Sequence, residues 1–172
     1  MSNETYPHKQ SNPSSRRAAE SPNGDGNGDG DNAPKTVHVK VMSFGYKQGL
    51  PPAANVIFDV RFLKNPYWVD ELRPLNGMRD VQVQDYVMNQ DTAIEFLNSV
   101  VELLANLLPR LPELKVNEFT IAFGCTGGQH RSATMCEKLA ARLCERFPTY
   151  KIEREHRELV NRLSSTTVLE DR

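Results

Sequence analysis

The sequence contains little cysteine, and this shortage argues against a disulfide-stabilised or metal-binding protein. Cys125, Cys136 and Cys144 are the three cysteines among 172 residues, and they form no Cys-x-x-Cys pair. Three cysteines without such a pairing predict reduced thiols in an intracellular, cytoplasmic protein. Because no spacing typical of metal ligands occurs either, we expect no metal and no cofactor.

Long apolar runs and a net charge are also missing. The longest apolar stretch, residues 94–108, includes Glu95 and Glu102, and it is too short and too polar to cross a bilayer. The formal net charge is −1, which provides no general attraction to nucleic acid or to anionic membranes. We therefore expect no membrane partner.

The first 35 residues differ in composition from the remainder. They contain no apolar run and include NGDGNGDGDN at residues 23–32. Such a segment cannot bury enough apolar surface to offset its ordering entropy, which predicts a disordered tail over residues 1–35. It also lacks the apolar region of a secretory signal. We expect one folded domain over residues 36–163, followed by a flexible tail over residues 164–172.

Four segments of the domain have the pattern of strands. Valines alternate with polar residues over residues 36–44, a period of two that indicates a strand. The short apolar run at residues 55–60 is typical of a strand buried on both faces. Residues 118–124 and 149–155 complete the set, whereas residues 64–80 look irregular.

Two long amphipathic helices are predicted between these strands. Thr92-Ala-Ile-Glu95 matches a capping box, and the apolar residues behind it are spaced by three and four until Pro109. The apolar positions of this helix are Ile94, Leu97, Val101, Leu104 and Leu108. A second helix is predicted from about His130 to Arg146, with Cys136, Leu139, Ala140, Leu143 and Phe147 on its apolar side. Cys136 and Cys144 are therefore interpreted as core residues, and residues 155–163 as a short closing helix.

Alternating strands and helices predict a single α/β sandwich domain with a largely parallel sheet.

The segment GCTGGQHRS, residues 124–132, joins a predicted strand to a predicted helix. A glycine-rich turn at this place presents backbone N–H groups, and the helix N-terminus adds partial positive charge. A tight turn with a helix cap would explain one glycine but not the whole segment. We therefore predict an anion-binding loop. Its residues are Cys125, Thr126, Gly127, Gly128, Gln129, His130, Arg131 and Ser132.

The same loop also matches the pattern Cys-x5-Arg-Ser. Cys125 and Arg131 then resemble the nucleophile and the phosphate-binding arginine of cysteine-dependent phosphatases. Gly124 stands where those enzymes place a histidine, and no aspartate can be assigned as the acid from the sequence. We assign no catalytic residue, and Cys125 remains the nucleophile only if the protein is a phosphatase.

Polar residues also follow the other predicted strands. Lys47 lies in a turn after the first strand, and Asp59, Arg61 and Asn65 follow the second. These side chains could read sugar hydroxyls beside the loop, although an Asp-x-Arg sequence is also typical of a surface ion pair. His156 and Arg157 could close the site or could belong to a solvated helix face.

Five blocks of the sequence together resemble the C-terminal domain of the RapZ family, the YvcJ-like bacterial RNase adapters. The blocks are SFGYKQGLPP (43–52), FDVRFLKNPYW (58–68), ELRPLNG (71–77), GCTGGQHRS (124–132) and EHREL (155–159). The resemblance implies an α/β fold similar to a subdomain of phosphofructokinases. It also implies binding of glucosamine-6-phosphate, RNA contacts, self-association as a homo-oligomer and recruitment of a ribonuclease.

Several positions depart from the family pattern. The GxxxxGK[ST] segment of the family's nucleotide-binding domain is missing, and Gln129, Gln48 and Glu155 stand where we expect basic residues. A lysine-rich C-terminal tail is missing as well, which disfavours RNA binding because phosphate contacts need such charges. The expected function is a stand-alone, metabolite-sensing module that binds a phosphorylated amino sugar or a similar anion. The alternatives are a cysteine-dependent phosphatase and an RNA-binding adapter.

Overall fold

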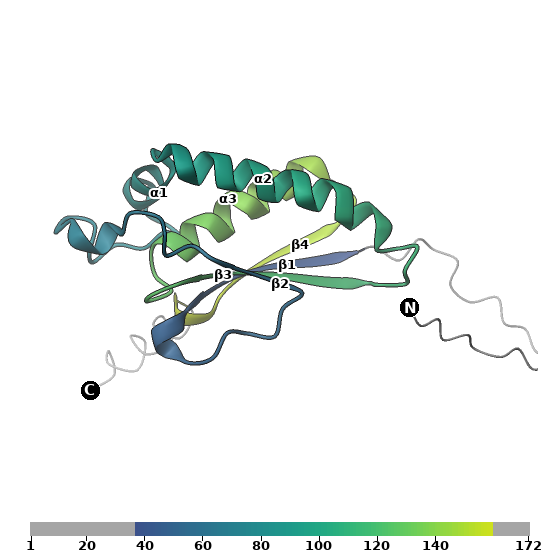
Figure 1. The fold of residues 1–172 in the computed structure, drawn as a ribbon, viewed down its shortest axis with the longest axis horizontal. Helices are drawn as coiled ribbons and strands as arrows, with labels where there is room; N and C mark the ends of the chain where they lie inside the picture. Colours follow the sequence, from purple (N-terminus) through teal and green to yellow (C-terminus); the bar gives the residue numbers. More distant parts are fainter. Residues whose placement is uncertain (1–36, 160–172) are drawn as a thin grey trace, which may run out of the picture. The chain divides into compact units, whose positions relative to one another are not determined.

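The computed structural model describes residues 37–159, which form an α/β domain around one parallel sheet (Figure 1). The strands are β1 (His38–Gly45), β2 (Val56–Asp59), β3 (Glu118–Cys125) and β4 (Lys151–His156), in the spatial order β2-β3-β1-β4. All neighbouring strands run parallel. The predicted α/β fold and largely parallel sheet are confirmed. The predicted tails over residues 1–35 and 164–172 lie outside the described residues.

The register of the sheet brings the ends of its two central strands together. Gly45, the last residue of β1, pairs with Cys125, the last residue of β3. Because both strands are parallel, the loops that follow them leave from the same edge of the sheet. Ligands of open α/β sheets bind at such an edge.

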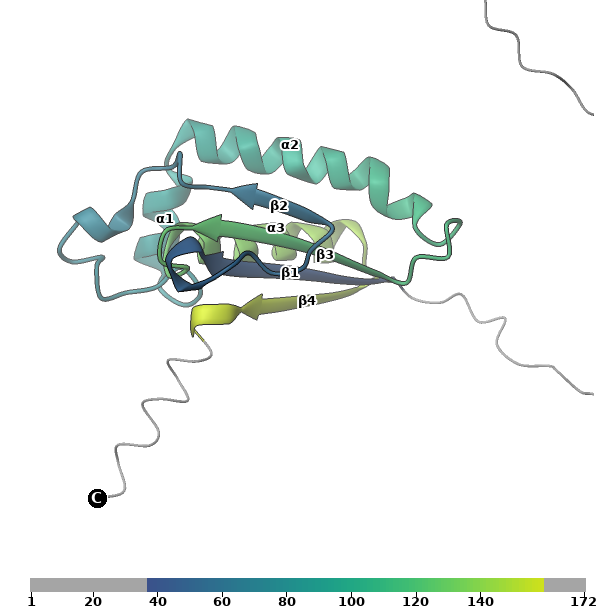
Figure 2. The same cartoon turned by 60° about the horizontal axis from the view of Figure 1, so that its bottom comes forward.

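The helices cover one face of the sheet (Figures 1 and 2). They are α1 (Val81–Met88), α2 (Asp91–Leu107) and α3 (Arg131–Arg146), with short 3-10 turns η1 (Tyr46–Gln48), η2 (Pro66–Trp68) and η3 (Leu108–Arg110). Buried side chains of the strands and helices form the main core between the two layers. On the opposite face a smaller cluster of Met42, Phe44 and Ala122 packs against Tyr46 and Ala54, where residues 49–55 run below the sheet in Figure 1.

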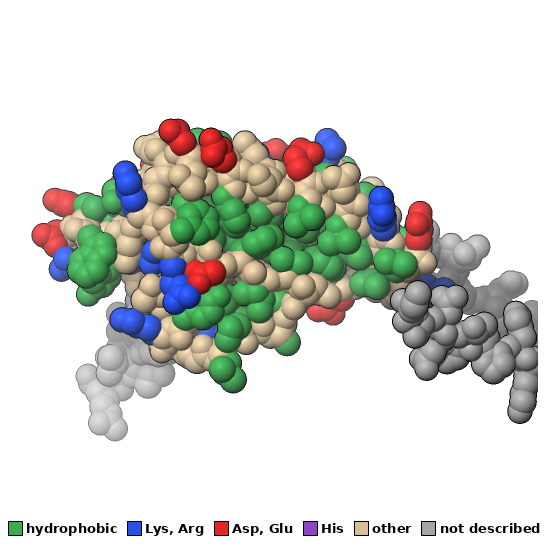
Figure 3. Space-filling model, viewed as in Figure 1, with side chains coloured by type: hydrophobic (Ala, Val, Ile, Leu, Met, Phe, Trp, Pro, Cys, Tyr) green, Lys and Arg blue, Asp and Glu red, His purple; other side chains and the backbone are tan. Residues whose placement is uncertain are grey.

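The prediction of β2 as a strand buried on both faces is wrong. β2 is an edge strand, and its residues alternate between partly buried and exposed positions. Phe58 packs against the main core, whereas Ile57 and Asp59 are exposed. Figure 3 shows hydrophobic side chains gathered on the face that carries β2 and α2, consistent with an edge strand that the described residues leave uncovered.

Both of the predicted long helices are present, as α2 and α3, but three details of the predictions are wrong. α2 begins at Asp91 with Gln90 as its N-cap, so Thr92 lies inside the helix and the predicted capping box is wrong. The buried stripe of α2 includes Ala93 and Val100 in place of Ile94 and Val101, while Leu97, Leu104 and Leu108 are buried as predicted. In α3, Cys136 is buried as predicted, but Cys144 is exposed because it falls outside the apolar stripe.

α1 was not predicted from the sequence. Its segment VQVQDYVM buries only Val83 and Val87, which is too short a stripe to indicate a helix. The predicted closing helix begins with helical residues 157–159, and its remainder lies outside the described residues. Among the described residues no helix is both long and apolar enough to span a membrane.

Candidate functional site

The glycine loop lies directly against the end of β1. A Cβ atom on Gly45 would lie 2.6 Å from the carbonyl carbon of Gly127, so the two backbones are in contact. Gly128 has φ +74°, a conformation that favours glycine. His130 is the N-cap residue of α3, and Arg131 is its first residue. The predicted strand-loop-helix unit is therefore present.

A cavity of about 460 Å³ opens beside this loop. The predicted site residues that line it are Lys47, Asn65, Cys125, Thr126, Gly127, Gln129, His130 and Arg131. Three further lining residues, Gln48, Tyr67 and Trp68, were not predicted. They belong to the turns that follow β1 and β2. Their position after the carboxyl ends of two strands is the sequence feature that could have identified them as cavity residues. None of the described residues that line the cavity carries a carboxylate.

Arg131 is 5% exposed and joins three segments of the chain. Its Nη1 donates to the carbonyl oxygens of Arg61 and Leu63 at 2.9 and 3.0 Å, and its Nη2 donates to Thr126 Oγ1 at 3.2 Å. Its buried Nε has no hydrogen-bond partner. Burial lowers the pKa of the guanidinium, but an arginine remains charged at neutral pH. Arg131, the predicted phosphate-binding residue, thus donates three of its five N–H groups to two backbone carbonyls and the Thr126 hydroxyl.

His130 contributes a second buried nitrogen to the loop. The side chain is 6% exposed, and its Nε2 makes no hydrogen bond. Burial lowers the pKa of the imidazole, and the nearby carbonyls of Leu72, Arg73 and Leu75 partly oppose that effect. Polar atoms that are buried without a partner are rare in folded proteins and call for an explanation such as a ligand or a water molecule.

The thiol of Cys125 lies inside the loop. Its Sγ is 3.1 Å from Ser132 Oγ and accepts the N–H of Gly128 at 3.2 Å. Ser132 is fully buried, and neither Ser132 nor Gly128 lines the cavity. The Gly128 N–H is therefore used within the loop and is not available to an anion.

Gln129 fixes the loop to the segment that precedes α1. Its Nε2 donates to the carbonyl of Leu75 at 2.7 Å and its own carbonyl accepts the N–H of Gly77 at 2.9 Å. A Cβ on Gly77 would lie 2.3 Å from the His130 carbonyl, so this contact is also backbone to backbone. The loop is thus clamped between residues 72–77 and β1.

Asp59 and Arg61 do not line the cavity. They form an exposed ion pair in which Arg61 Nε lies 2.9 Å from Asp59 Oδ2. Hydrogen bonds from Arg61 lower the pKa of Asp59, and the Arg61 guanidinium lies 4.4 Å from the centre of the Tyr46 ring. The Asp59 carboxylate, which the sequence suggested could read sugar hydroxyls, is paired with Arg61 in this structure.

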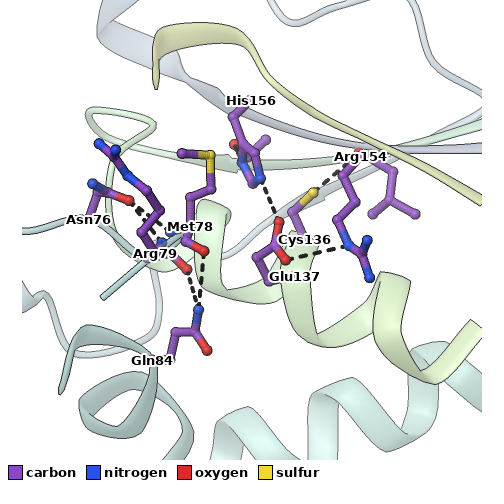
Figure 4. Close-up of polar contacts among 11 residues, drawn as sticks. Asn76, Met78, Arg79, Gln84, Cys136, Glu137, Arg154 and His156 are labelled. Atoms are coloured by element: carbon purple, nitrogen blue, oxygen red, sulfur yellow. Dashed lines mark hydrogen bonds and ion pairs between the residues drawn. The ribbon is translucent and has the colours of Figure 1, made fainter. Parts of the chain in front are cut away.

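His156 and Arg157 are not among the residues that line the cavity. His156 is buried between Ser43 and Glu137, with contacts of 2.8 Å on both sides, and Glu137 also contacts Arg154 (Figure 4). Arg157 donates to the carbonyls of Gly45 and Leu50. These contacts secure β4 to α3 and the end of β1, and the predicted role of the pair in closing the site remains a prediction.

The fold and the cavity define a single α/β domain with a polar pocket at the carboxyl ends of parallel strands. Its sequence matches the model of the RapZ C-terminal domain over residues 37–160, and the chain belongs to this family. It is similar to proteins named nucleotide-binding protein from Corynebacterium glutamicum, at 46% identity over 74% of this chain, and from Dinoroseobacter shibae, at 44% identity over 77%. The chain spans 40% and 43% of the length of these two relatives.

Proposed function

We propose that this domain binds a phosphorylated sugar, such as glucosamine-6-phosphate, and acts as a metabolite-sensing module. The observation that carries the proposal is the charge of the cavity lining, in which Lys47 and Arg131 are cationic and none of the described residues carries a carboxylate. A pocket with fixed positive groups and no internal counter-charge favours an anion. Arg131 lines the cavity, and hydrogen bonds from charged groups to phosphate are strong.

The glycine loop supplies the second part of the support. Gly127 lines the cavity, and a Cβ placed on it meets no atom within 4 Å. The backbone at this residue is therefore open to a close approach by the ligand, and the adjacent N-terminus of α3 favours negative charge. Phosphate oxygens would lie against residues 126–131, with the sugar toward Asn65 and Gln48.

Calorimetry tests the proposal with glucosamine-6-phosphate as ligand and glucosamine as the control that lacks phosphate. Gly127→Val fills the open space without a clash in the fold, so we expect it to weaken binding at least about tenfold while the unfolding temperature stays unchanged. Lys47→Ala should weaken binding as well. Lys151→Ala, at the opposite end of the sheet, is the matched control. Equal affinity for glucosamine and its phosphate, or wild-type affinity in Gly127→Val, would contradict the proposal.

A thiol phosphatase is the second candidate, and the contacts of Cys125 favour it. A sulfur that accepts an N–H and faces a hydroxyl resembles an activated nucleophile. Against this, Arg131 Nη1 is held by two carbonyls, and the cavity lining offers no carboxylic acid to protonate a leaving group. We expect no hydrolysis of an aryl phosphate above that of Cys125→Ser, and activity lost in that variant would favour the enzyme.

A further inference from the structure

Two aromatic side chains stand exposed at the cavity. Trp68, the single tryptophan of the chain, is 76% exposed, and Tyr67 is 46% exposed. Both line the cavity that the glycine loop also lines. Their ring centres are 5.4 Å apart at an interplanar angle of 83°. Large aromatic surfaces are normally buried because their exposure to water is unfavourable, so their position beside a polar pocket indicates a contact with a ligand.

The backbone holds this aromatic pair in place. Asn65 accepts the N–H of Tyr67 with its side chain, Pro66 is buried, and the N–H of Val69 bonds to the Pro66 carbonyl. Arg73 donates to the Tyr67 carbonyl at 3.1 Å, and its guanidinium lies 5.1 Å from the centre of the Tyr67 ring. The turn η2 therefore presents the rings from a hydrogen-bonded backbone, so the backbone does not have to be ordered when a ligand binds.

The cavity consequently has two chemically different ends. The loop of residues 126–131 is positive and rich in backbone donors, whereas η2 is aromatic. The amides of Asn65, Gln48 and Gln129 are further lining groups. A ligand that matches both ends carries an anion, several hydroxyl groups and one apolar face.

We propose that Trp68, supported by Tyr67, stacks on the C–H face of a pyranose ring, so that the site selects the ring form of a hexose phosphate. This inference rests on the proposed binding of a sugar phosphate and specifies the form of the sugar. A pyranose presents axial C–H groups on one face and hydroxyls around its rim, which suit one aromatic face and a set of amides. A nucleobase suits a slot between two parallel rings, whereas the rings of Tyr67 and Trp68 are set nearly perpendicular to each other.

Because Trp68 is the only tryptophan, its fluorescence reports directly on this contact. The protein would be titrated with glucose-6-phosphate, with its open-chain reduction product glucitol-6-phosphate, and with inorganic phosphate. The two sugar phosphates carry the same charge and differ in the ring. We expect the emission of Trp68 to change with glucose-6-phosphate alone, and glucitol-6-phosphate to bind at least roughly tenfold more weakly.

Variants at exposed positions test the same contact by calorimetry. Trp68→Ala should reduce affinity for glucose-6-phosphate roughly tenfold and leave that for glucitol-6-phosphate and inorganic phosphate unchanged. Trp68→Phe should restore most of the loss, because it keeps an aromatic face. Leu50→Ala removes another exposed apolar side chain outside the cavity lining and should have no effect.

The outcomes separate this inference from the proposed function. Equal binding of ring and open-chain phosphates, with silent Trp68 fluorescence, would refute the stacking and leave anion binding intact. Tighter binding of adenosine monophosphate than of glucose-6-phosphate would show that the rings take a base, which also refutes it. If neither the sugar phosphates nor inorganic phosphate binds, the proposed function fails and the inference fails with it.

Discussion

Arg131 serves both the fold and the cavity. Its removal would leave the carbonyls of Arg61 and Leu63 without their donor. A buried polar group that loses its partner costs about 1–3 kcal/mol. We expect Arg131→Ala to lower the free energy of unfolding in urea by about this amount, and to weaken binding of glucosamine-6-phosphate roughly ten- to a hundredfold. Arg110→Ala, an exposed arginine at η3, is the control. Unchanged stability would mean that the observed carbonyl contacts contribute little.

The two adjacent loop glycines should respond differently to substitution. A Cβ on Gly128 would lie 2.4 Å from Glu158 Oε2, and φ at this residue is positive. A Cβ on Gly127 meets nothing within 4 Å. We therefore expect Gly128→Ala to lower the unfolding temperature by several degrees, because its cost is on the order of 1 kcal/mol or more, and Gly127→Ala to leave it unchanged. Thermal unfolding of both variants provides the comparison, and equal effects would contradict this account of the loop.

Individual site residues differ in how far the sequence could predict them. Cys125 to Arg131 were predictable because a strand, a glycine pair and a helix follow one another locally. For Asp59 and Arg61 the sequence left open a role in sugar binding or a surface ion pair, and the structure shows the ion pair. Tyr67 and Trp68 were missed because they lie beside the glycine loop only in the folded chain. Such proximity depends on long-range packing, which the local sequence pattern does not show.

At the scale of elements, we expect the free energy of unfolding to depend on pH through His130, the N-cap residue of α3. Burial lowers the pKa of His130 below its ordinary value of 6.5. As pH falls below about 6.5, the imidazole of the unfolded chain therefore takes up a proton before that of the folded chain. Proton uptake favours the unfolded state, so the free energy of unfolding decreases over this range. We expect wild-type protein to lose more unfolding free energy between pH 7.5 and pH 5.5 than His130→Gln.

Parallel urea titrations of the two proteins at both pH values measure this difference. The other residues are identical in the two proteins, so their contributions cancel in the comparison. Equal losses in wild type and His130→Gln would show that the imidazole titrates as it does in the unfolded chain.

The elements themselves were predictable where their pattern was long. The alternating valines of β1 and the apolar stripe of α3 are local signals that packing confirms. The start of α2 was misplaced because Thr92 and Glu95 match a cap by composition, while the chain enters the helix at Gln90. The burial of β2 was misjudged because a short apolar run has the same pattern in central and edge strands, and only the strand order distinguishes the two.

At the scale of the whole molecule, the distribution of charge bears on RNA as a partner. The chain has 21 basic and 22 acidic residues. Several basic side chains of the described residues are paired with carboxylates, as in Lys40–Glu155, Arg73–Asp70 and Arg157–Glu158. Affinity for RNA depends chiefly on cations that replace counterions along the phosphate backbone. Paired cations would have to give up these partners first.

We therefore expect weak binding of structured RNA at physiological salt, with a dissociation constant above about 1 μM. Filter binding over a range of salt concentrations measures both the affinity and the number of phosphate contacts, since the slope of log affinity against log salt reports that number. Glucosamine-6-phosphate should leave this weak binding unchanged if the cavity serves a metabolite alone. Sub-micromolar affinity with a steep salt slope would contradict the prediction and favour an RNA adapter. Loss of that affinity in Lys47→Ala would then place the RNA at the same cavity, since Lys47 lines it.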